Sequence, residues 1–140
     1  MIDNTEAIVD ITRFMQAKGE LGGSFARIVG FFREDGEKAI RAIESAMGRG
    51  DAAALVRPAH TLKGESLQFG AELLGSAAET IEKAAREAVE HHEFPTHVAV
   101  QVAQLRPLFH HSLAFFDREL AAVAPAMPVR RAVGFGRKTA

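Results

Sequence analysis

The 140-residue sequence contains no cysteine, no tryptophan and no tyrosine, and only five prolines. Without cysteine the chain can form neither a disulfide framework nor a thiolate zinc site. No run of about 18 apolar residues is present, and the N-terminus lacks the basic and then apolar pattern of a signal sequence. We therefore expect a cytoplasmic protein that does not interact with membranes.

Basic residues are scarce outside the C-terminal end. The chain has 17 Lys and Arg against 18 Asp and Glu, and four of the basic residues lie in the last 16 positions. Residues 1–124 thus carry 13 basic against 18 acidic side chains. Because nucleic-acid binding requires a basic face, an acidic body argues against a nucleic-acid partner.

The remaining composition is that of an ordinary globular protein. Hydrophobic residues make up 47% and charged residues 25% of the chain, and the length suits one domain with a real core. Apolar residues recur every three or four positions, and no stretch alternates with a period of two. The fold class predicted is all-α.

Five helical segments are predicted. The first runs from Thr5 to Ala17, and the glycines at positions 19, 22 and 23 interrupt the helical pattern after it. Its apolar stripe consists of Ile8, Ile11 and Met15. The second comes after an N-cap at Ser24 and runs to about Met47, where glycines again end the helix.

The third segment begins after an N-cap at Asp51 and ends at a turn marked by Gly70. The fourth carries an apolar stripe through Leu74, Ile81 and Ala85, and the fifth begins at Pro95. Long amphipathic helices with short connections predict an antiparallel up-down four-helix bundle with a short N-terminal capping helix. The expected division is a capping helix over residues 1–19, the bundle over 20–124 and a mobile basic tail over 125–140.

The third segment places a histidine on its outer face. If the residues spaced four and three apart face inward, His60 lies about 160° from Leu62 and faces solvent. Lys63 and Gly64 lie one turn later on the same face, where the Lys63 ammonium can neutralise a phosphoryl group on the imidazole. The inward stripe consists of Leu55, Ala59, Leu62, Ser66 and Phe69.

Gly64 is unusual because a glycine inside a helix costs about 1 kcal/mol relative to alanine. A bare strip of backbone beside His60, against which another protein packs closely, would account for it. The residues expected to bind that partner are Val56, Arg57, Gly64 and Leu67.

An antiparallel hairpin that turns at Gly70 brings residue 60 level with about residue 80 of the next helix. Glu79 and Glu82 both lie there. A carboxylate that accepts the Nδ1 proton of His60 would leave Nε2 as the nucleophile. Glu82 is the preferred candidate for orienting the imidazole, and Glu79 is the alternative.

Two other classes of function compete with phosphoryl transfer. The histidines outside this segment do not form the Glu-x-x-His pattern of a metal-binding bundle, so no metal site is predicted; they are His91, His92, His97, His110 and His111. A non-catalytic helical module that docks its partner without accepting phosphate would also use Gly64. The outward His60 and its neighbour Lys63 favour transfer instead.

The third predicted segment, with the turn after it, resembles the histidine-phosphotransfer family, whose motif His-x-Leu-Lys-Gly is followed by a Gly-Ala turn. The matching residues are His60, Leu62, Lys63, Gly64, Gly70 and Ala71, and the resemblance extends over about residues 20–122. The segment also looks like the phosphoryl-accepting domain of chemotaxis histidine kinases, where a glutamate in the place of Glu82 bonds the imidazole.

The resemblance implies a monomeric phosphoryl carrier without kinase activity of its own. His60 would accept a phosphoryl group from a receiver phospho-aspartate and pass it to another receiver in a two-component phosphorelay. The implied partners are response-regulator receiver domains and a hybrid histidine kinase, and the non-catalytic alternative would dock a receiver or kinase without accepting phosphate. The receiver would supply the Mg²⁺, so the chain itself is expected to hold no cofactor.

Overall fold

A computed structural model describes residues 8–123, and every regular element in that range is a helix. The all-α prediction is confirmed. The predicted tail over 125–140, and residues 5–7 of the predicted first helix, lie outside the described residues. The elements are α2 (Ile11–Leu21), the 3₁₀ turn η1 (Gly22–Ser24), α3 (Phe25–Arg49), α4 (Ala52–Gln68), α5 (Glu72–Glu90), the 3₁₀ turn η2 (Thr96–Val98) and α6 (Ala99–Val123).

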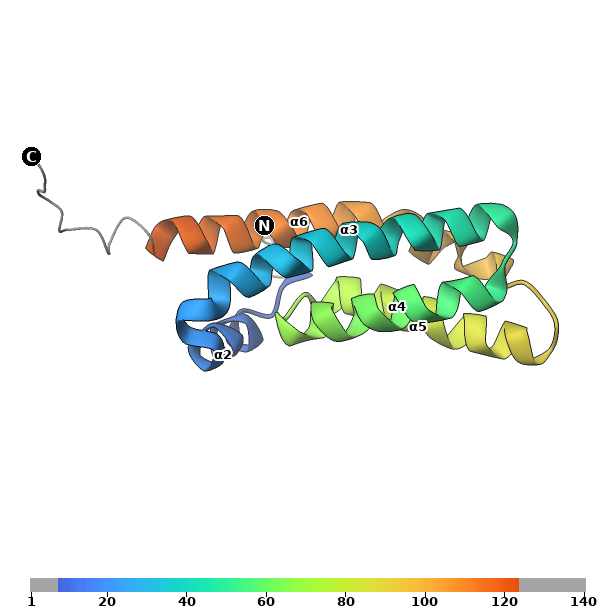
Figure 1. Cartoon of the computed structure of the whole chain (residues 1–140), viewed down its shortest axis with the longest axis horizontal. Coiled ribbons are helices and arrows are strands. Elements are labelled where there is room, and N and C mark those ends of the chain that lie inside the picture. The colour runs from blue at the N-terminus through green and yellow to red at the C-terminus, as the bar shows by residue number, and fades with distance from the viewer. Residues whose placement is uncertain (1–7, 124–140) are drawn as a thin grey trace, which may run out of the picture.

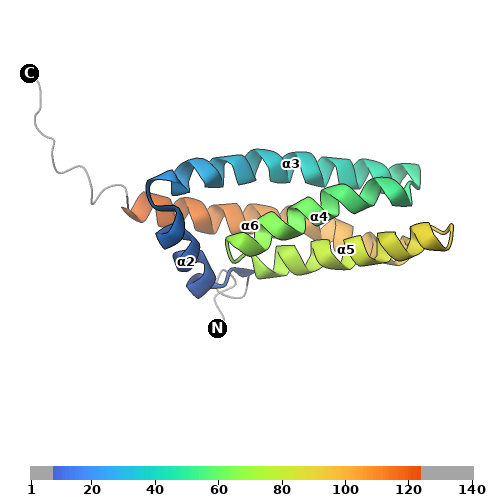
Figure 2. The same ribbon diagram turned by 60° about the horizontal axis from the view of Figure 1, so that its bottom comes forward.

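Helices α3 to α6 form the predicted antiparallel up-down bundle. Figure 1 shows α3 and α6 in one layer and α4 and α5 in the other. Each helix packs against two neighbours, with α4 between α3 and α5, and α6 between α5 and α3. The short α2 lies across one end of the bundle, as Figure 2 shows. The predicted four-helix architecture with a capping helix is confirmed.

Phenylalanine rings fill the centre of the bundle at the end that α2 covers. Phe32 of α3 lies 5.6 Å from Phe69 and 5.9 Å from Phe116 of α6, measured between ring centroids. Phe14 of α2 stacks on Phe116 at 5.1 Å and meets Phe25 edge-on at 5.3 Å. Such ring pairs add about 0.5–1.5 kcal/mol each beyond the area that they bury. The capping helix is therefore part of the main core.

The predicted apolar stripe of the first helix is wrong at two of its three positions, since only Ile8 is buried. Ile11 and Met15 are 42% and 47% exposed, whereas Phe14 and Ala17 are buried. The helix begins at Ile11 after an N-cap at Asp10, whose side chain accepts a hydrogen bond from the Arg13 N–H. Val9 and Asp10 are not helical, and this break interrupts the helical phase that the sequence pattern assumed. The helix also continues past the predicted end at Ala17 to Leu21.

Two other predicted helix starts are corrected. Ser24 precedes α3, but its side chain makes no capping hydrogen bond because its backbone is already helical at the end of η1. The fifth helix begins at Ala99, because Pro95 is followed first by the 3₁₀ turn η2. The predicted N-cap at Asp51 is confirmed, since its carboxylate accepts the Ala54 N–H at 3.1 Å. Within residues 8–123, no helix is both long and apolar enough to span a membrane.

Candidate functional site

The inward stripe of α4 is buried as predicted. All five of its members are at most 1% exposed: Leu55, Ala59, Leu62, Ser66 and Phe69. This burial fixes the rotation of the helix about its axis. The opposite side of α4 faces solvent, and the side chain of His60 is 61% exposed there.

The turn at Gly70 sets the register between α4 and α5. Gly70 has φ of 81°, a conformation that side chains rarely adopt. A Cβ at this position would also lie 2.6 Å from the carbonyl oxygen of Asp10. The Gly70 carbonyl accepts a hydrogen bond from the Asp10 N–H at 2.7 Å, which ties the turn to the start of α2.

In this register Glu82 of α5 lies beside His60. Nδ1 of His60 and Oε2 of Glu82 are 2.9 Å apart. Glu79, the alternative carboxylate, is exposed, and no hydrogen bond joins it to His60 in the described structure. Of the two carboxylates that the hairpin geometry placed level with His60, Glu82 is therefore the one in contact with it.

The Glu82 carboxylate is buried, with 6% of its side chain exposed, and it contacts three cationic or ionisable side chains. Oε1 lies 3.0 Å from Nζ of Lys63. Oε2 accepts hydrogen bonds from Nη2 and Nε of Arg86 at 2.7 and 3.1 Å. Burial by itself would raise the pKa of Glu82, but the hydrogen bonds from Arg86, Lys63 and His60 outweigh it and lower the pKa to about 2.

An ionised carboxylate only accepts hydrogen bonds, so the Nδ1 atom that faces it must donate. In the neutral imidazole this leaves the lone pair on Nε2, which is the ring nitrogen farther from Glu82. The site therefore presents an oriented nucleophilic nitrogen on an exposed helix face.

Arg86 is the residue that the sequence reasoning missed. The spacing of Glu82 and Arg86, one helical turn apart, is the signal that would have found it. Lys63 was predicted beside His60 as a cation for a phosphoryl group. The structure places its ammonium on Glu82, with the side chain 26% exposed.

The four residues predicted to bind a partner all lie on the His60 side of α4. Arg57, Gly64 and Leu67 are exposed, and Val56 is half-buried. A Cβ added at Gly64 would meet no atom within 4 Å, so the strip beside His60 is open. Leu67 extends across to α5, where it occupies the space that a Cβ at Gly75 would need.

The other histidines do not form a second centre in residues 8–123. No group of three or more His, Cys, Asp or Glu side chains there is arranged to hold a metal ion. Nδ1 of His91 instead bonds the carbonyl oxygen of Glu87 at 2.9 Å, at the end of α5.

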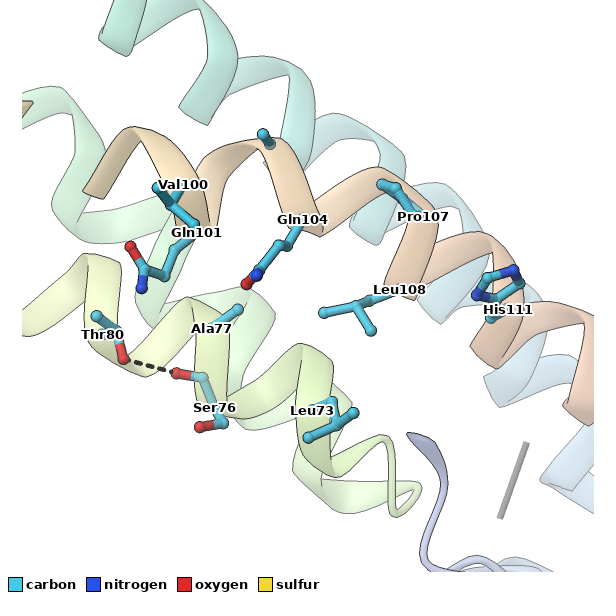
Figure 3. A pocket seen from close by; sticks show the side chains of 11 residues that line it. Leu73, Ser76, Ala77, Thr80, Val100, Gln101, Gln104, Pro107, Leu108 and His111 are labelled. Atoms are coloured by element: carbon cyan, nitrogen blue, oxygen red, sulfur yellow. Dashed lines mark hydrogen bonds between the residues drawn. The ribbon is translucent and has the colours of Figure 1, made fainter. Parts of the chain in front are cut away.

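A groove of about 750 Å³ lies between α5 and α6 (Figure 3). It is lined by apolar side chains such as Leu73, Val100 and Leu108, and no Asp, Glu, Lys or Arg contributes to its wall. The hydroxyl of Thr80 bonds a backbone carbonyl in its own helix. Permanently charged groups converge at His60 and not in this groove, whose polar lining consists of Ser76, Thr80, Gln101, Gln104 and His111.

Comparisons with known proteins agree with this fold. The model of the Hpt domain family matches residues 27–123. Among solved structures, histidine-containing phosphotransfer protein B (HptB) from Pseudomonas aeruginosa PAO1 superposes with a TM-score of 0.73 at 23% sequence identity. The alignment covers 82% of this chain and 96% of that one, and it shows that the two share a fold. No curated protein sequence matches the chain.

Proposed function

Since the chain belongs to the Hpt domain family, we propose that His60 accepts a phosphoryl group from a receiver phospho-aspartate and passes it to another receiver. The observation that supports this role is the exposed imidazole whose Nδ1 is held by the buried Glu82. A histidine fixed in this way is more ordered than a solvated surface histidine. Glu82 bonds Nδ1 and so leaves Nε2 of His60 free to react.

The proposed step is a displacement at phosphorus. The Nε2 lone pair forms the N–P bond while the bond from phosphorus to the aspartyl oxygen breaks, and the aspartate leaves as a carboxylate. The Nδ1 proton stays in its hydrogen bond with Glu82, whose negative charge offsets the positive charge of the phosphorylated ring. Onward transfer is the same step in reverse with a second receiver.

The proposed docking surface is the exposed face of α4 around His60. Gly64 lets a partner approach the backbone. The side chains around the histidine are both apolar and charged, and they are Val56, Arg57 and Leu67. We propose that a monomer binds the receiver domains of response regulators and of a hybrid histidine kinase. The Mg²⁺ that the reaction needs would belong to the receiver, and the carrier would have no kinase activity.

The direct test is incubation with a panel of phosphorylated receivers, followed by assay for an acid-labile, base-stable phosphate on the chain. His60→Gln should abolish acceptance without changing the melting temperature, because the side chain is 61% exposed. His91→Gln, at another exposed histidine, is the matched control and should be phosphorylated normally. Phosphate on the His60→Gln protein would show that His60 is not the phosphoryl acceptor. Receiver binding without any phosphate on the wild type would favour the non-catalytic docking module.

The contact between His60 and Glu82 also favours a second candidate, the phosphoryl-accepting domain of a chemotaxis-type kinase. In that case the donor is a kinase with ATP and not a phospho-aspartate. Comparing acceptance from phosphorylated receivers with acceptance from such kinases separates the two functions.

A further inference from the structure

The Oε2 atom of Glu82 is shared between the imidazole and a guanidinium. Nδ1 of His60 lies 2.9 Å away, and two N–H groups of Arg86 donate to the same oxygen. The other oxygen faces the ammonium of Lys63 at 3.0 Å. One buried anion thus contacts two permanent cations and one titratable ring.

A carboxylate beside Nδ1 has two effects on an imidazole, and they oppose each other for a nucleophile. It orients the ring and selects the tautomer with Nε2 unprotonated. It also favours the protonated ring, in which Nε2 carries a proton and has no lone pair. A buried carboxylate with no other partner would thus orient the ring but also hold it in its unreactive form.

We propose that Arg86 is a positioning residue that offsets the charge of Glu82, so that the carboxylate orients His60 without keeping the ring protonated. This inference rests on the proposed function of His60 as a nucleophile. The geometry suits the role, because both N–H groups of Arg86 reach the oxygen that faces the imidazole. They also limit rotation of the carboxylate about its own axis.

Lys63 also offsets the charge of Glu82, but it contacts Oε1, whereas Arg86 bonds Oε2, the oxygen that faces the imidazole. Within residues 8–123, the remaining charged side chains near His60 form no ion pair with Glu82. On α4, Arg57 lies one turn before the histidine and is exposed. On α5, the exposed Glu79 and Lys83 carry opposite charges that offset each other. On the α3 side of α4, Asp35 lies beside Glu65, whose pKa it raises.

The test compares Arg86→Gln, Arg86→Lys and a matched control, Arg41→Gln. Arg41 of α3 makes the same kind of pair, with a glutamate one turn earlier, Glu37, at 3.0 Å. Both arginines are mostly exposed, at 58% and 73% of their side chains, so neither change should unfold the bundle. Titration of the His60 ring by NMR is the first readout, since it requires no phosphate.

Loss of the Arg86 charge should move the midpoint of the His60 titration up by about half to one pH unit. Arg86→Lys should restore most of the wild-type midpoint, and Arg41→Gln should leave it unchanged. Transfer by Arg86→Gln should fall about two- to five-fold when it is measured at the wild-type midpoint, and it should approach the wild-type rate well above the midpoint of the variant. A role limited to stability would not produce this recovery with pH.

A double-mutant cycle with Glu82→Gln sharpens the test. Without the carboxylate, Arg86 is no longer held at the site by its hydrogen bonds, so removal of Arg86 should raise the midpoint less than it does when Glu82 is present. An unchanged or lowered midpoint in Arg86→Gln would overturn the proposal. If the wild type accepts no phosphate from any donor, the proposed function fails, and the titrations still decide whether Arg86 controls the ring.

Discussion

Substitutions of Gly64 are expected to raise the stability of the fold and to lower the rate of phosphoryl transfer. Gly64 lies inside α4 with no positive φ, and a Cβ there meets nothing within 4 Å. Gly64→Ala should therefore stabilise the fold by up to about 1 kcal/mol, through helix propensity and the unfolded chain. Phosphoryl transfer should fall, and fall most for Gly64→Gln, because added bulk separates the receiver from His60. Thermal melts and single-turnover transfer rates measure the two effects. If Gly64→Gln unfolds the protein, Gly64 is a packing contact and not a docking strip.

Glu65, the next residue, should make stability fall as the pH rises. Burial and the neighbouring Asp35 raise its pKa from 4.5 to about 7. Between these values the folded state binds more protons than the unfolded state, so the free energy of unfolding decreases with increasing pH. Glu65→Gln should remove this decrease and raise the melting temperature at pH 8 more than at pH 5. Equal changes at both pH values would show that Glu65 is ionised in the fold at pH 5.

The position of His60 and the region of its carboxylate partner could be predicted because they depend on backbone geometry. The position of His60 is set by the helical period, and the length of the hairpin limited its partner to Glu79 or Glu82. The actual partner of Lys63 could not be predicted, since a long flexible side chain selects its partner among several nearby groups. Its ammonium contacts Glu82, a choice that depends on burial of the carboxylate.

A second glycine, inside α3, should respond in the opposite way to Gly64. A Cβ at Gly36 would overlap the ring of Phe109 from α6, which is 1% exposed and has no free space to move into. Gly36→Ala should destabilise the protein by about 1–3 kcal/mol by forcing α3 and α6 apart. Chemical denaturation of Gly36→Ala beside Gly64→Ala measures the contrast. Stabilisation by both substitutions would show that the contact between α3 and α6 adapts easily.

The helices differ in how well their faces could be predicted. The strict spacing on α4 identified every buried position, because one continuous helix carries the pattern. The prediction for the first helix was wrong at Ile11 and Met15 because Ile8 precedes the cap at Asp10. Ile8 therefore belongs to a different helical phase from Phe14. Apolar spacing alone does not reveal where a short helix begins, and with so few turns an error at the start changes the whole face.

Closure of the bundle at one end should depend on α2. Phe14 is fully buried and contacts the rings of Phe25, Phe115 and Phe116. Phe14→Ala should cost about 3–5 kcal/mol, a large part of the stability of a domain of this size. Met15→Ala, at a position 47% exposed, should change stability by less than about 0.5 kcal/mol. Urea unfolding of both variants tests this, and a small effect of Phe14→Ala would show that the bundle closes without α2.

The hairpin of α4 and α5 also has a consequence for the order in which the molecule forms. The partners His60 and Glu82 are 22 positions apart in the chain, whereas the contact of Arg33 with Asp117 between α3 and α6 spans 84. Contacts between near positions close small loops and lose less chain entropy, so they are favoured early in folding. The reactive centre is thus assembled within one local unit. Transient opening at the far end of α6 should leave that unit intact, so amide hydrogens around His60 should exchange more slowly than those of the last turns of α6.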